Sequence, residues 1–107
     1  MRVAISVADG LVAQMDSCQQ ILVADLENGQ VKGRSYLANP GQGTAGVRVA
    51  ELEQLGVSRL ITSGLDCSTK TEFQNAGIRI LEGATGSPEA VLTAYVHGNL
   101  RPPEENL

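Results

Sequence analysis

Aromatic side chains and long apolar runs are scarce in this chain of 107 residues. Phe73, Tyr36 and Tyr95 are its only aromatic residues, so the core must consist mainly of valine, leucine, isoleucine and alanine. No apolar stretch approaches the roughly 20 residues that a membrane-spanning helix needs, and the first residues follow a strand pattern rather than that of a signal peptide. We therefore expect a soluble, cytoplasmic protein with no membrane partner.

An excess of positive charge is also missing. The chain has 8 Lys and Arg residues against 12 Asp and Glu residues, which gives a formal net charge of −4. A protein that binds nucleic acid through its phosphates needs a basic surface. We therefore expect no nucleic-acid partner.

The residues of common hydrolytic sites are absent as well. His97 is the only histidine, and near the end of the last expected helix it is interpreted as a solvated residue, so no Ser-His-Asp arrangement is available. The first expected strand, from Val3 to Val7, lacks the central acidic residue that a two-metal nuclease requires. We therefore expect that the protein is not an enzyme.

Cysteine is represented twice, by Cys18 and Cys67, which lie 49 residues apart. They form neither a CxxC pair nor a disulfide framework, so we expect free thiols. The plain interpretation of each is a small, buried apolar residue.

Glycine, in contrast, is abundant, and its densest run is Gly41-Gln42-Gly43-Thr44-Ala45-Gly46. The run matches G-x-G-x-x-G and precedes a helical pattern, so its N–H groups are suited to an anionic ligand. A dinucleotide is disfavoured, because the preceding segment reads as a half-exposed strand and the chain is too short for two mononucleotide-binding halves. A phosphate-binding loop and a plain helix-entry loop both remain open.

The remaining pattern predicts an α/β protein with one domain over residues 1–100 and a polar tail over 101–107. Strands are expected at 2–7, 21–26, 31–37, 59–62 and 78–81, and helices at 47–55, from about 68 to 76 and at 89–98. Asn28-Gly29 predicts a type I′ hairpin between the second and third strands. Right-handed crossovers then give a mixed five-stranded sheet, order 3-2-1-4-5, with helices on both faces.

This topology gathers four loops at one edge of the sheet: 9–19, 41–46, 64–68 and 83–87. Ligands of open α/β sheets bind at this carboxyl edge. Cys18 and Cys67 are both assigned to it, which makes a shared pocket for a soft ligand reasonable. We also expect Gly83 to Gly86, a second glycine-rich turn, to lie beside the run at 41–46.

Several segments carry a family resemblance through their order and spacing: Met1-Arg2-Val3-Ala4-Ile5, Gly10-Leu11-Val12, the strand ending at Asp25, Gly43-Thr44-Ala45-Gly46, Leu55-Gly56-Val57, Ala76-Gly77-Ile78, and Gly83-Ala84-Thr85-Gly86 with Ala94 to Leu100. Over residues 1–100 the chain resembles the dinitrogenase iron–molybdenum cofactor biosynthesis family, the group of NifX, NafY and the NifB C-terminal domain. The resemblance implies a ribonuclease-H-like, three-layer fold. It also implies binding or carriage of iron–sulfur or molybdenum-containing clusters.

The chain departs from the family pattern in two loops. Gln14 stands where many members have a histidine that is a candidate cluster contact, Met15 stands at their phenylalanine, and Cys18 at their Ala/Cys position. Asp66-Cys67 replaces their Gly-Pro after the fourth strand, which adds a thiol near a helix start, where the helix dipole favours an anion. Thiolates are preferred ligands of iron–sulfur centres, so ligation by sulfur rather than histidine is indicated.

These observations predict a non-enzymatic carrier of an iron–sulfur or iron–molybdenum-type cluster, as in nitrogenase cofactor biosynthesis, with cluster donor and acceptor proteins as partners. A small-molecule or nucleotide-phosphate sensor and a ligand-free interaction domain are the alternatives. The expected metal ligands are Cys67 and Cys18. Further cofactor contacts are expected from Gln14, Met15, Gly41, Gly43, Thr44, Gly46 and Ser68.

Overall fold

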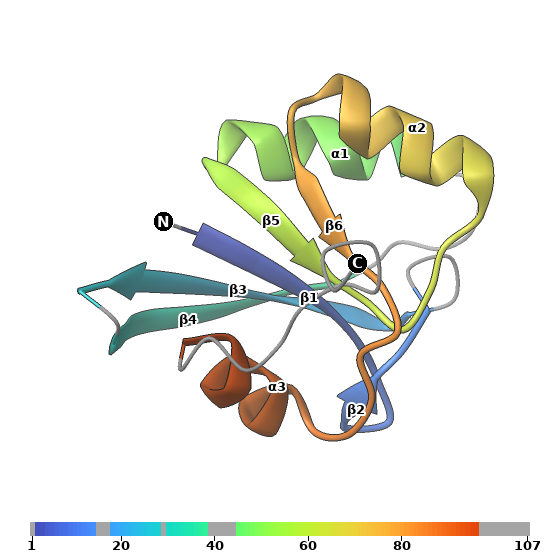
Figure 1. Ribbon diagram of the computed structural model, residues 1–107. Helices are drawn as coiled ribbons and strands as arrows, with labels where there is room; N and C mark the ends of the chain where they lie inside the picture. The colour runs from blue at the N-terminus through green and yellow to red at the C-terminus, as the bar shows by residue number, and fades with distance from the viewer. Residues whose placement is uncertain (1, 15–17, 29, 39–44, 97–107) are drawn as a thin grey trace, which may run out of the picture.

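A mixed β-sheet with helices on both faces forms the centre of the computed structural model, which describes residues 2–14, 18–28, 30–38 and 45–96 (Figure 1). The strands are β1 Arg2–Ala8, β2 Leu11–Val12, β3 Gln20–Glu27, β4 Gln30–Ala38, β5 Val57–Ile61 and β6 Arg79–Leu81. The helices are α1 Ala45–Gln54, α2 Cys67–Asn75 and α3 Pro88–Val96. None of these helices has the length and apolar character that a bilayer crossing requires.

The main path through the sheet runs β4-β3-β1-β5-β6. Strand β3 is antiparallel to both β1 and β4, whereas β1, β5 and β6 are mutually parallel where they pair. The predicted hairpin is therefore confirmed, and Asn28 has the positive φ of 54° that its turn requires. Gly29, the other turn residue, lies outside the described residues.

The predicted number of five strands is wrong, because the described residues form a sixth strand, β2. Asp9 and Gly10 have φ values of 53° and 77°, which turn the chain tightly back at the end of β1. Leu11 then pairs with Ala8, and Val12 pairs with Val7. Part of the segment expected as a free loop is thus hydrogen-bonded to the central strand.

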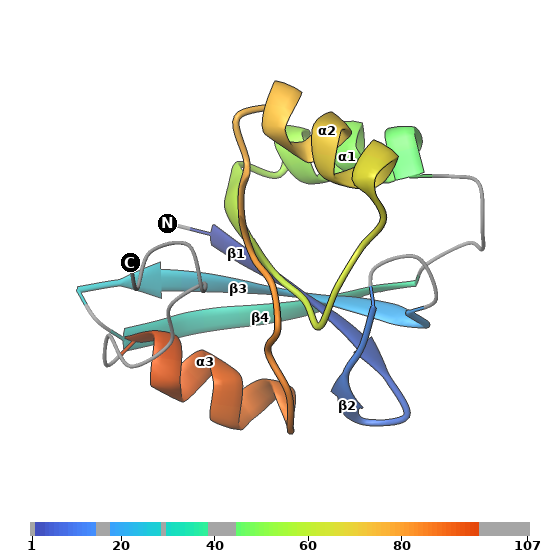
Figure 2. The ribbon, with the colours of Figure 1, turned by 45° about the vertical axis from the view of Figure 1, so that its right-hand side comes forward.

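The core lies on both faces of β1, whose residues from Val3 to Val7 are all buried. Val3, Ile5 and Val7 contribute to a cluster that includes Val91 and Leu92 of α3. Ala4, on the opposite face, belongs to a second cluster formed with α1 and α2. Figure 2 shows α1 and α2 side by side over one face and α3 over the other. The expectation of helices on both faces is confirmed.

The helix boundaries follow local signals with one exception. Asp66 caps α2, and Gly77, with a φ of 80°, follows its C-cap. Ser87 accepts a hydrogen bond from the N–H of Ala90 at 3.2 Å, and Pro88 is the first residue of α3, a combination typical of helix starts. The exception is Gly46, which lies in α1 and not in the turn where we expected it.

Candidate functional site

Three loops meet at the carboxyl edge of the parallel strands. The N–H of Val12 donates to the carbonyl of Gly86 at 2.8 Å, and that of Ser63 donates to Ala13 at 3.3 Å. The N–H of Gly83 donates to Ser63, also at 3.3 Å. The segments that follow β2, β5 and β6 are therefore joined by backbone hydrogen bonds, as the expected strand directions require.

Two buried hydroxyl groups lie beneath these loops. Ser6 and Thr62 are both fully buried, and their oxygen atoms are 2.8 Å apart. The carbonyl of Ala13 is 2.5 Å from Ser6 Oγ and 3.0 Å from Thr62 Oγ1. Thr62 Oγ1 also contacts the carbonyl of Gly64 at 3.0 Å and accepts from its N–H at 3.3 Å. We did not single out either hydroxyl from the sequence, although a polar residue within an apolar strand is a signal for both.

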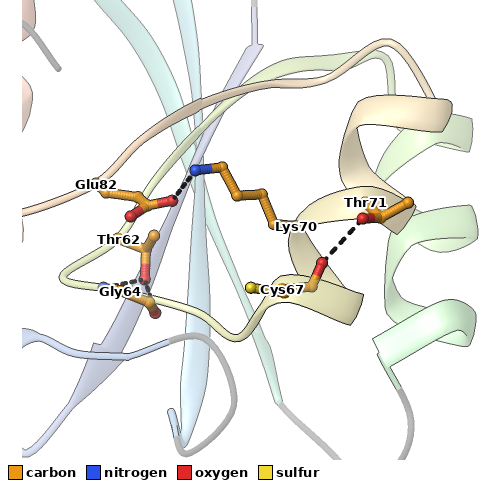
Figure 3. Close-up of polar contacts among 6 residues, drawn as sticks. All are labelled: Thr62, Gly64, Cys67, Lys70, Thr71 and Glu82. Atoms are coloured by element: carbon orange, nitrogen blue, oxygen red, sulfur yellow. Dashed lines mark hydrogen bonds and ion pairs between the residues drawn. The ribbon is translucent and has the colours of Figure 1, made fainter. Parts of the chain in front are cut away.

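Cys67 is the first residue of α2 and is exposed. In Figure 3 its sulfur atom points toward the side on which Gly64 and Thr62 lie. Its carbonyl accepts a hydrogen bond from the hydroxyl of Thr71 at 2.9 Å. The prediction that places a thiol at a helix start on this edge is thus confirmed in its position, and its role as a metal ligand stays a prediction.

The cap of α2 adds a negative charge next to this thiol. Asp66 Oδ1 accepts from the N–H of Thr69 at 2.8 Å and from the hydroxyl of Ser68 at 2.9 Å. These hydrogen bonds, the one from the Thr69 backbone first, hold the pKa of Asp66 below its ordinary value. Ser68, expected to contact a cofactor, uses its hydroxyl as a donor to the cap.

An ion pair ties α2 to the loop after β6. Lys70 Nζ and Glu82 Oε1 are 2.8 Å apart, and Figure 3 shows the lysine reaching from α2 toward that loop. Both side chains are about one-third exposed, at 38% and 33%. Such a pair contributes little stability, roughly 0–1 kcal/mol, but it fixes the direction in which Lys70 points. The pairing was missed from the sequence because its members lie on different elements.

Gln14, which stands at the family's histidine position, lies over the loop that carries Cys67. A Cβ atom built on Gly64 would be 3.9 Å from the Cγ atom and 4.0 Å from the Nε2 atom of Gln14. A methyl group on Gly64 would therefore meet the Gln14 side chain at ordinary van der Waals distance, so the side chain lies close to Gly64 with room for one carbon atom between them. The structure therefore brings Gln14 to the same edge as the start of α2, as expected.

Cys18 occupies a different environment from Cys67. Its side chain is only 5% exposed and packs in the apolar cluster that contains Ile21, Leu52 and Phe73. This matches the plain interpretation of a small buried residue, and ligation by Cys18 stays a prediction. Four other expected contacts, Met15, Gly41, Gly43 and Thr44, lie outside the described residues, as do His97 and the tail at 101–107. The expected contact between the two glycine-rich turns therefore stays a prediction too.

Within the described ranges, no group of three or more His, Cys, Asp or Glu residues is placed to hold a metal ion. The edge offers one exposed thiol, an amide side chain and a hydrogen-bonded loop framework. Such a set does not form a closed cage, because stable iron–sulfur clusters are normally held by four cysteines.

A hollow of about 320 Å³ runs along β3 and β4, from the start of β1 to Leu37. Arg2, Asp25 and Leu55 are among its lining residues, and Arg2 Nη1 donates to the carbonyl of Leu55 at 2.5 Å. Its charged residues are exposed and carry both signs. The hollow was not predicted.

Comparison with known proteins gives a consistent result. The family model described as dinitrogenase iron-molybdenum cofactor matches residues 1–98. No curated protein sequence matches the chain. Among solved structures, PH0822 is 23% identical, with a TM-score of 0.86, and the match covers 96% of this chain and 95% of that one.

Two further structures are similar. A candidate NifB protein from Thermotoga is 25% identical, with a TM-score of 0.76 and coverage of 94% of this chain and 91% of that one. The apo form of the orange protein from Desulfovibrio gigas is 18% identical, with a TM-score of 0.77 and the same two coverages, 94% and 91%. These likenesses show that the fold is shared along nearly the whole chain. Since the family model spans residues 1–98 of 107, the chain belongs to the dinitrogenase iron-molybdenum cofactor family.

Proposed function

We propose that this protein is a non-enzymatic carrier of an iron–sulfur or molybdenum-containing cluster, which it receives from one protein and delivers to another. The observation that supports this most directly is the exposed Cys67 at the first residue of α2, on the sheet edge where the loops meet. A thiolate is the ligand that such clusters prefer. Membership of the family supports the same class of cargo.

The chemistry of the edge suits a transient hold. A single exposed thiol can bond to one metal atom of the cluster, while backbone N–H groups of neighbouring loops donate to its sulfides. Gln14 can add an amide donor from the side of Gly64. The carboxylate of Asp66 lies at the positive end of the same helix, next to the thiol, and adds a negative charge there. Weak retention is useful to a carrier, since it must release its cargo.

Reconstitution under anaerobic conditions tests this proposal. The protein is incubated with iron, sulfide and molybdate, desalted, and analysed for metal content and visible absorbance. We expect wild type to retain metal and Cys67→Ser to lose most of it, because a serine hydroxyl is a much poorer ligand for a soft metal. Equal metal content in both proteins would refute ligation by Cys67.

Cys18→Ser is the matched control, because it removes the other thiol from a buried position. A loss equal to that of Cys67→Ser, in a protein that remains folded by circular dichroism, would show that Cys18 is a ligand as well. No metal in wild type would instead favour the small-molecule or phosphate-sensing role of residues 41–46, or a ligand-free interaction domain.

The family resemblance also leads us to propose that the fold is ribonuclease-H-like. Three antiparallel strands, β1, β3 and β4, followed by the parallel strands β5 and β6 and helices on both faces support this assignment. The cytoplasmic location stays a prediction of the sequence.

A further inference from the structure

The buried hydroxyls of Ser6 and Thr62 are placed at the carboxyl ends of neighbouring strands. Ser6 lies in β1, and Thr62 directly follows β5. Both side chains have no exposed surface, so each must find its hydrogen-bond partners inside the protein. We call this pair the hydroxyl clamp.

The partners of the clamp lie in the two loops of the candidate site. Ser6 and Thr62 both contact the carbonyl of Ala13, the residue before Gln14. Thr62 also contacts both the carbonyl and the N–H of Gly64, which lies near the Gln14 side chain and precedes Cys67 in the same loop. The clamp thus joins two segments that are remote in sequence. One segment leads to Gln14 and the other to Cys67, and both residues are expected cluster contacts.

A count of protons limits how many of these contacts are hydrogen bonds at one time. Each hydroxyl has a single proton to donate, yet the two oxygens make four close contacts with each other and with the carbonyls of Ala13 and Gly64. The carbonyl of Ala13 also accepts from the N–H of Ser63. At most two of the four contacts are therefore hydrogen bonds donated by these hydroxyls at one time, and removing either hydroxyl takes one of the two protons from the network that joins the loops.

We propose that Ser6 and Thr62 are positioning residues that hold the loop of Gln14 and the loop of Cys67 in fixed register for the cargo. This inference rests on the proposed function, because the register matters only where both loops contact the same cluster. The clamp itself touches no cargo, since it is fully buried. It sets how long the cargo stays bound by limiting how far the two loops separate.

The experiment compares Thr62→Val and Ser6→Ala with wild type. Thr62→Ser restores the hydroxyl without the methyl group and serves as the rescue. Ser58→Ala is the control, because it removes a hydroxyl at the other end of β5, where Ser58 contacts the carbonyl of Arg2. Two readouts are measured on each folded protein: amide hydrogen exchange of Ser63 and Gly64 by NMR, and the rate at which the reconstituted iron–molybdenum–sulfide cargo passes to a chelator.

We expect Thr62→Val and Ser6→Ala to speed exchange at Ser63 and Gly64 by about threefold to tenfold, the range that one net hydrogen bond gives. Cargo loss should speed up in the same two variants, and Thr62→Ser and Ser58→Ala should behave as wild type. The two readouts together separate positioning from plain stabilisation.

Unchanged exchange in Thr62→Val would overturn the clamp. Faster exchange with unchanged cargo loss would overturn positioning, because the hydroxyls would then only stabilise the loops. Should Thr62→Val not fold, Ser6→Ala and its exchange rates decide the same question. If wild type takes up no cargo at all, the proposed function fails and the positioning role fails with it, whereas the exchange rates still show whether the loops are held.

Discussion

Replacing Phe73 by alanine should destabilise the protein by about 3–5 kcal/mol. Phe73 is fully buried and lies in the apolar cluster between α2, α1 and the sheet. A buried phenylalanine removes roughly 150–250 Å² from water, which at about 25 cal/mol per Å² is worth about 4–6 kcal/mol, and alanine keeps a small part of it. Because a domain of this size is typically stable by only about 5–15 kcal/mol, the variant should be close to the limit of folding.

Urea unfolding followed by far-ultraviolet circular dichroism measures this change, since the chain has no tryptophan to report by fluorescence. With a slope of about 2 kcal/mol per molar urea, the midpoint should fall by about 2 M. Tyr36→Ala is the control, because that ring is 55% exposed on β4 and its loss should cost well under 1 kcal/mol. Equal falls in the two variants would refute the assignment of Phe73 to the core. Helix α2, whose first residue is Cys67, would then lack an apolar anchor in the core.

Three further changes test other parts of the structure. Asp66→Asn should make stability less sensitive to acid. Because the pKa of Asp66 is lowered in the folded protein, its contribution to stability is complete above the ordinary pKa of 3.8 and is lost as the pH falls through the lowered pKa. Unfolding midpoints measured from about pH 6 to about pH 2 should therefore fall less in the variant than in wild type. Gly64→Ala should fold as wild type, because the added methyl group meets Gln14 at 3.9 Å and Gly64 has no positive φ; a large drop in thermal midpoint would contradict that geometry. A double-mutant cycle on the exposed ion pair of Arg34 and Glu89, 2.7 Å apart, should give a coupling below about 1 kcal/mol, and a larger value would show that β4 and α3 depend on this contact.

The sheet could be predicted largely because its signals are local. The Asn28-Gly29 pair in the sequence predicts the hairpin of β3 and β4. The pattern then changes from that of a strand to that of a helix, so the later strands must be joined by helical crossover connections, whose handedness is known. Strand β2 was missed, because two residues are too few to show an alternating pattern. From the sequence, Asp9 and Gly10 indicate the end of a strand, whereas in the structure they reverse the chain from β1 into β2.

The candidate site could be predicted only in part. The position of Cys67 follows from sequence, since Asp66 is a recognisable cap and the crossover fixes the edge on which the helix begins. The ion pair of Lys70 with Glu82 and the contact of Ser6 with Thr62 join residues on different elements, and no periodicity within one element reveals such contacts. Burial of Cys18 likewise depends on how β3 packs against the helices above it.

The backbone anchoring of the segment after β1 makes the folding of that segment independent of which side chain it exposes. Pairing of β2 with β1, and the backbone hydrogen bonds of Ala13 with Ser6 and Ser63, act beside the hydroxyl clamp to fix the path of the chain up to Gln14, and none of these contacts uses the side chain of Gln14. The identity of the exposed side chain at Gln14 is therefore of little consequence for folding. The side chain at this position can be exchanged while the scaffold stays constant, so a single fold can present different exposed groups there by substitutions that cost little stability.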